Sequence, residues 1–375
     1  MKKTLAALAV LGAFAGSAMA ADVTLYGAVD TGFEYFHKKD TDNGVSTKSD
    51  TFDMQTGWDT PSCWGLKGSE DLGNGYKVSF KLESGFNSDD GTMGQNNRLF
   101  GREAGLTLSG PFGSVAFGRF GGISSSAGTY DMLGYVESFD GGDGDVWGFA
   151  SSSRYDNMVV YQTPRFAGLQ LTAQYSFKTD SQKDSQKSTK DGYSGDEGTS
   201  DAQRYASVGL SGEYGPASFA VGYELTKYGV DNSGERALDK DGQLVFLGGN
   251  YDFEVVQLFA EAQYFKHQTA TNAGEAETLG KNGLGLKGYG LHLGAAAPLA
   301  GGTLTAGLYY MDFSEEVVDQ ADEDAKYYGV SARYNYPLSE RTGLYAGAGY
   351  GQLKADDTDY KEQVTQVYCG LVHTF

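Results

Sequence analysis

The chain of 375 residues has little of what helical membrane proteins and metalloproteins contain. Beyond its first twenty residues, no run approaches the roughly 20 consecutive apolar residues that a transmembrane helix requires. It has two cysteines, Cys63 and Cys369, and four scattered histidines, without zinc-finger, CxxC or HExxH spacing. These absences disfavour a helical membrane protein and structural zinc, and nothing in the sequence calls for a metal or a cofactor.

Positive charge is also scarce. The 29 Lys and Arg residues face 49 Asp and Glu residues, a net charge of −20, which argues against nucleic acid as a partner. Proline is rare (6), whereas glycine (55) and tyrosine (26) are abundant and phenylalanine adds 21 aromatic residues. So many aromatic residues disfavour disorder. Together the counts favour a large, closed, all-β protein with many tight turns.

The first twenty residues are typical of a secretory signal peptide. Lys2 and Lys3 precede an apolar stretch, and Ala18, Met19 and Ala20 form a small-x-small cleavage site. We therefore predict a signal peptide at 1–20 and a single domain at 21–375.

The remaining chain alternates apolar and polar residues with period two, as strands with two different faces do. Short turns and long polar loops alternate between the strands, which is typical of an outer-membrane β-barrel. A soluble β-sandwich is disfavoured because the apolar face is rich in Ala, Gly and Tyr rather than in bulky aliphatic residues. The predicted fold is an all-β, sixteen-stranded antiparallel transmembrane barrel with strands near 22–36, 52–70, 74–87, 98–110, 112–120, 149–163, 167–178, 204–214, 217–228, 242–253, 254–267, 285–297, 302–313, 326–336, 342–354 and 363–375.

The last predicted strand places Cys369, Leu371, His373 and Phe375 on its outer face and ends in an aromatic residue. Cys63 is predicted to face the lumen, so a disulfide between the two cysteines is not expected.

The sequence resembles the general porins of Gram-negative bacteria over the whole chain after the signal peptide. The resemblance is carried by residues 23–27, 64–75, 98–102, 113–119, 164–168 and 370–375. It implies a homotrimer in the outer membrane that admits ions and small hydrophilic solutes by passive diffusion. It further implies contacts with lipopolysaccharide and with the assembly machinery, for which Leu371, His373 and Phe375 form the C-terminal signal.

In that family a long loop folds into the barrel and places acidic residues opposite a basic wall. The resemblance assigns this constriction loop to residues about 121–148, with Glu137, Asp140 and Asp143 as its acidic side. On the wall, Arg102 and Arg154 match basic positions, and Lys67 and Lys81 share the polar face of their strands.

This chain departs from the family at Cys63, which replaces a third basic residue of the wall. Losing that charge is expected to favour cations. Two alternatives remain open, a substrate-specific channel and a structural or adhesive barrel with little conductance. An enzyme is not expected, because His292 has no Ser partner in a catalytic context.

Overall fold

The computed structural model describes residues 23–133, 149–182, 195–230, 234, 236–273, 283–319, 321–356 and 358–375. The predicted signal peptide lies outside these residues, as do Glu137, Asp140 and Asp143. Within the described part of the chain, no helix is both long and apolar enough to cross a membrane.

Seventeen strands form one antiparallel sheet across the described residues. They are β1 (Thr24–Asp42), β2 (Val45–Thr56), β3 (Cys63–Gly73), β4 (Tyr76–Gly85), β5 (Glu103–Gly110), β6 (Gly113–Gly121), β7 (Arg154–Gln162), β8 (Leu169–Ser176), β9 (Arg204–Tyr214), β10 (Ala217–Lys227), β11 (Gly242–Asp252), β12 (Gln257–Gln268), β13 (Gly283–Leu299), β14 (Gly302–Val317), β15 (Glu323–Pro337), β16 (Thr342–Ala355) and β17 (Lys361–Thr374). A short turn, α2 (Gly94–Asn97), follows β4, and its left-handed Gln95 and Asn96 prevent a regular helix.

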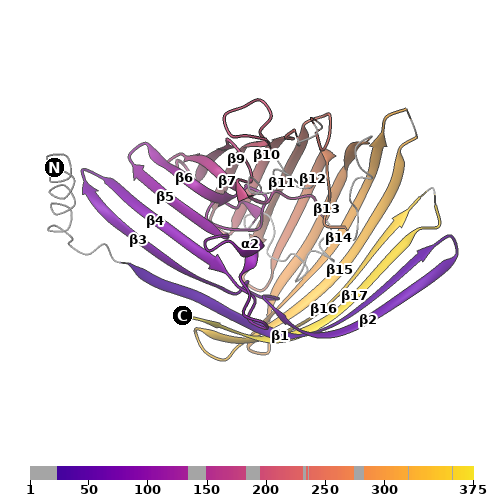
Figure 1. The fold of residues 1–375 in the computed structure, drawn as a ribbon. Helices are drawn as coiled ribbons and strands as arrows, with labels where there is room; N and C mark the ends of the chain where they lie inside the picture. Colours follow the sequence, from indigo (N-terminus) through magenta and orange to yellow (C-terminus); the bar gives the residue numbers. More distant parts are fainter. Residues whose placement is uncertain are drawn as a thin grey trace.

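The sheet closes into a barrel through β1, which runs between β17 on one side and β2 and β3 on the other (Figure 1). One edge of β1 pairs with β17, from Ala28 opposite Thr374 to Thr41 opposite Lys361. The other edge pairs with β3 near its start and with β2 further along. Because β2 and β3 share one position in the wall, the barrel has sixteen strand positions, which confirms the predicted fold.

Two details of the predicted strands are wrong. The predicted strand 52–70 is interrupted at residues 57–62, where Gly57 has a left-handed φ of 79° and Pro61 has no N–H to donate to a ladder. The predicted long loop at 37–51 is instead a tight hairpin, because β1 and β2 continue to Asp42 and Val45. Asn43 and Gly44 turn the chain there with φ of 48° and 77°, as a two-residue hairpin requires.

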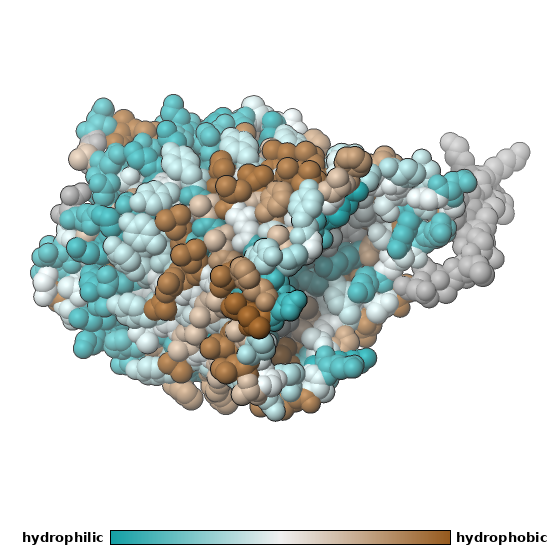
Figure 2. All heavy atoms as spheres, turned by 180° about the vertical axis from the view of Figure 1, so that it is seen from behind, coloured by the Kyte–Doolittle hydropathy of each residue, from teal (hydrophilic) through white to brown (hydrophobic). Residues whose placement is uncertain are grey.

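The outer face of the wall is apolar. Large hydrophobic side chains alternate outward along neighbouring strands, and Figure 2 shows hydrophobic residues gathered on this face with hydrophilic residues at its margins. The exposed members include Leu247, Leu258, Leu293, Leu308, Val330 and Val367. Cys369 is exposed and belongs to this face, whereas Cys63 is buried, and both are free cysteines as predicted.

Candidate functional site

The wall of β3 to β5 carries two pairs of opposite charges that face the lumen. Arg102 Nε lies 2.7 Å from Glu83 Oε1, and Lys81 Nζ lies 2.8 Å from Glu103 Oε2. Lys81 also approaches Glu83 Oε2 at 3.5 Å, so the pairs form one network. Two of the predicted basic residues are therefore neutralised by carboxylates of the same wall.

These carboxylates were missed in the sequence, although a signal was present. Lys81 and Glu83 are two residues apart on one strand, so the alternation already places them on one face. Further hydrogen bonds hold both groups: Tyr26 Oη donates to Glu83 Oε2 at 2.8 Å and Thr129 Oγ1 donates to Glu103 Oε1 at 2.6 Å. The second bond ties the segment after β6 to the charged wall.

Lys67 extends the basic side toward the short-turn end of the barrel. It pairs across the strands with Lys81, and its ammonium lies 5.0 Å from the ring centroid of Tyr26. A cavity of about 440 Å³ opens here, with Ser69, Ser79 and Thr107 also in its lining. A polar, roomy recess of this kind holds water rather than an apolar core.

Cys63 and Arg154 complete the predicted wall. Cys63 lies between Ala28 and Gly85 of the neighbouring strands and is 8% exposed. Arg154 begins β7 within electrostatic range of Arg102 and Arg119, and its Nε has no hydrogen-bond partner among the described residues. The structure thus brings Lys67, Lys81, Arg102, Arg154 and Cys63 to one side of the barrel.

The segment after β6 turns into the barrel and is held there by buried polar groups. The carboxylate of Glu224 on β10 accepts hydrogen bonds from Ser124 N at 3.0 Å, Ser152 Oγ at 3.0 Å and Tyr205 Oη at 2.8 Å. Because three donors satisfy this buried carboxylate, both limbs of the loop are fixed to the same point of the wall.

A second clamp holds the returning limb. Gln263 on β12 accepts a hydrogen bond from Ala150 N at 3.0 Å and donates one to Ala150 O at 3.2 Å. The amide therefore satisfies both backbone groups of one loop residue.

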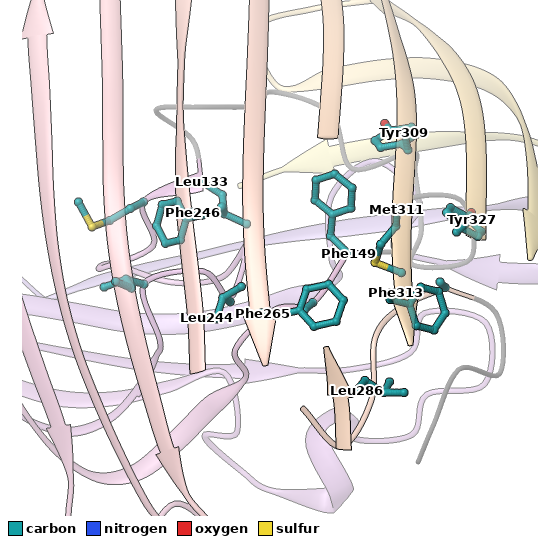
Figure 3. Close-up of a cluster of buried hydrophobic side chains, with 14 of the residues drawn as sticks. Leu133, Phe149, Leu244, Phe246, Phe265, Leu286, Tyr309, Met311, Phe313 and Tyr327 are labelled. Atoms are coloured by element: carbon teal, nitrogen blue, oxygen red, sulfur yellow. The ribbon is translucent and has the colours of Figure 1, made fainter. Parts of the chain in front are cut away.

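Apolar side chains complete the docking of the loop. Leu133 and Phe149 from the loop lie among Phe246, Phe265 and Met311 of the wall (Figure 3), and Phe149 is 0% exposed. The ring of Phe149 stands edge-on to those of His292 and Tyr309, each at 6.4 Å between centroids. Part of the lumenal face of β11 to β16 is thus apolar, where the alternation predicted polar residues, because it serves as a seat for the loop.

A second aromatic contact lies in the first limb of the loop, which the structure describes up to residue 133. Tyr130 packs edge-on against Phe120, with 5.2 Å between ring centroids, and burial raises the pKa of its hydroxyl. The predicted acidic residues Glu137, Asp140 and Asp143 follow in the part of the loop outside the described residues, so their role stays a prediction.

An ionic clamp joins four segments at the long-loop end of β5 to β8. The carboxylate of Asp156 receives Arg98 Nη1 at 3.1 Å and Arg119 Nη1 at 2.6 Å. Arg98 also reaches Asp180, and Ser181 N donates to Asp156 Oδ2 at 2.7 Å. The side chain of Asp156 is only 9% exposed. The ion pairs with Arg98 and Arg119 therefore offset the free-energy cost of removing this carboxylate from water.

The chain terminus closes the barrel beside β1. Gly27 and Phe375 exchange backbone hydrogen bonds of 3.1 and 3.0 Å, and a Cβ on Gly27 would meet the Phe375 ring at 2.5 Å. Leu371 is exposed on the outer face and His373 Nδ1 lies 2.9 Å from Thr342 Oγ1. A role of these residues in assembly stays a prediction.

Comparison with known proteins places this geometry among outer-membrane channels. A family model described as Gram-negative porin matches residues 6–357. An outer membrane porin protein of Bordetella pertussis is 35% identical over the full length of both chains, and outer membrane porin protein 32 of Delftia acidovorans is 31% identical over 99% of this chain and 95% of its own. A solved anion-selective porin from Comamonas acidovorans superposes with a TM-score of 0.67 at 26% identity, covering 95% of this chain and all of that one. With its barrel and these relatives, the chain belongs to the Gram-negative porins of the outer membrane.

Proposed function

We propose that the chain assembles as a homotrimer whose barrels let ions and small hydrophilic solutes diffuse passively through water-filled channels. The observation that carries this is the charged lumenal wall of β3 to β5 beside a loop seated inside the barrel. A barrel of sixteen strands is too wide for side chains to fill, so water occupies the remainder. Lipopolysaccharide and the assembly machinery remain partners by family resemblance alone.

The proposed selectivity is weak, in place of the cation preference expected from the sequence. Glu83 and Glu103 neutralise Arg102 and Lys81, while Lys67 and Arg154 keep positive charge on the wall. The solved porin of 26% identity is itself described as anion-selective, which gives no support to a cation preference. Removing one carboxylate is therefore expected to move the balance toward anions.

We expect Glu83→Gln to shift the zero-current potential toward that of chloride under a KCl gradient in a planar bilayer. The variant loses one negative charge beside Arg102 and Lys81, so anions meet less repulsion there. Cys63→Arg is expected to act in the same direction, because it adds a positive charge to the same wall. Both shifts should become smaller as the salt concentration rises, because the screening length becomes shorter.

Glu254→Gln is the matched control, since Glu254 is exposed in the turn between β11 and β12. Equal potentials for all four proteins would contradict a role of this wall in selectivity. Absence of conductance in the unmodified protein would contradict the channel itself.

A further inference from the structure

The interruption between β2 and β3 turns residues 57–62 into the barrel. Thr56 pairs with Thr31 of β1 and Cys63 pairs with Ala28. Six residues of the chain therefore stand opposite only Val29 and Asp30, far more than the one extra residue of an ordinary β-bulge. The surplus chain has to leave the plane of the wall, and its contacts show on which side.

Residues 57–62 lie against the lumenal faces of three strands distant in sequence. Arg333 on β15 donates from Nη1 to Trp58 O at 2.7 Å, and Asn335 donates to Asp59 Oδ1 at 2.5 Å. The ring of Trp58 stacks on that of Tyr368 of β17 at 5.0 Å between centroids. The segment therefore covers the inner surface of β15 to β17.

The side chain of Asp30 fixes this segment from β1. It is 0% exposed, and its Oδ2 accepts hydrogen bonds of 2.8 Å from the backbone N–H groups of Asp59 and Thr60. Its Oδ1 accepts from Tyr345 Oη of β16 at 2.5 Å. A buried carboxylate with three such donors holds the chain as a capping residue holds a helix end, since removing it leaves buried N–H groups unpaired.

The segment lies toward the short-turn end of the barrel, which faces the periplasm in outer-membrane barrels. Asp59 and Thr60 line a cavity of about 400 Å³ together with Arg341, in the turn between β15 and β16, and Thr342, the first residue of β16. The inward loop after β6 is held by other side chains, namely Glu224 on β10, Gln263 on β12 and an apolar cluster that extends from β11 to β16. The two insertions are thus held by separate groups.

We propose that residues 57–62 form a fixed ledge that narrows the periplasmic half of the channel and, through the clamp of Asp30, Tyr345, Arg333 and Asn335, limits solute size independently of the inward loop. The ledge goes beyond the proposed function and rests on it only in that the barrel conducts solutes. The position of the ledge is set by its hydrogen bonds to Asp30, Arg333 and Asn335.

The test uses Cys63, which follows the ledge directly and is 8% exposed. In a Cys369→Ser background it is the only thiol, so its reaction with a maleimide reports the position of the ledge. Asp30→Asn replaces the charged acceptor of three hydrogen bonds by a neutral amide with one acceptor oxygen, which weakens the hold on Asp59 and Thr60. It is expected to speed labelling about tenfold, which corresponds to roughly 1.4 kcal/mol. In liposome swelling with uncharged sugars of increasing size, the Asp30→Asn variant is expected to admit larger sugars than the protein with Asp30 does.

Arg333→Gln tests the opposite side of the clamp and decides the question if Asp30→Asn does not fold. Asp252→Asn is the control, since that carboxylate accepts a backbone hydrogen bond in an exposed turn. Unchanged labelling in a folded variant would overturn the clamp. If labelling becomes faster but the largest sugar that passes the channel stays the same, the ledge does not narrow the channel. If the unmodified protein admits no sugar at all, the proposed channel function is contradicted, whereas the labelling rate of Cys63 still tests the ledge.

Discussion

Phe149→Ala is expected to give channels with a higher and noisier single-channel conductance than the unmodified protein. Phe149 is fully buried between the inward loop and the wall, and replacing a buried Phe by Ala costs about 3–5 kcal/mol. The polar clamps at Glu224 and Gln263 remain, so the loop should alternate between seated and displaced positions. Planar-bilayer recordings at fixed voltage measure both effects.

Phe117→Ala is the matched control, because Phe117 is 53% exposed on the outer face of β6. It removes the same atoms without touching the lumen and should leave conductance unchanged. Identical traces from Phe149→Ala and the unmodified protein would show that the apolar seat does not hold the loop.

Asp156→Ala is expected to lower the free energy of unfolding by about 3–5 kcal/mol, the usual cost of breaking a buried ion pair. The change leaves Arg98 and Arg119 without the carboxylate that both contact. It also removes the acceptor of Ser181 N, so the segment after β8 loses one of its attachments to β7. Urea-induced unfolding followed by tryptophan fluorescence in detergent measures the loss.

Asp180→Ala provides the comparison, because Asp180 contacts Arg98 and is 27% exposed. Its effect should be much smaller, since Asp156 still pairs with Arg98 and water replaces part of the lost contact. Equal losses from both substitutions would contradict the central position of Asp156.

The charged lumenal wall shows which features side-chain alternation can predict and which it cannot. Lys67, Lys81, Arg102 and Arg154 were predicted on one wall. The register pairs Lys67 with Lys81, Arg102 contacts Glu83, and Arg154 lies within electrostatic range of Arg102. Their partners Glu83 and Glu103 were not identified. Side-chain alternation gives the face of each residue but not the distance between charges on neighbouring strands, which depends on register.

The ledge at residues 57–62 illustrates the same limit. Gly57 and Pro61 are visible in the sequence as strand breakers, yet the predicted strand ran through them. The inward, ordered path of these residues depends on Asp30, Tyr345 and Arg333, and Arg333 lies 275 positions from Trp58, whose carbonyl it contacts. Such contacts exist only after the barrel closes.

The sequence by itself determined the strand faces, the sixteen strand positions and the outer-membrane class, because period-two alternation is a local property of each strand. The tertiary structure decided the pairing of charges, the apolar seat of the inward loop and the direction of the ledge. Each of these depends on which side chains of distant strands meet inside the closed wall, and no local pattern encodes that meeting.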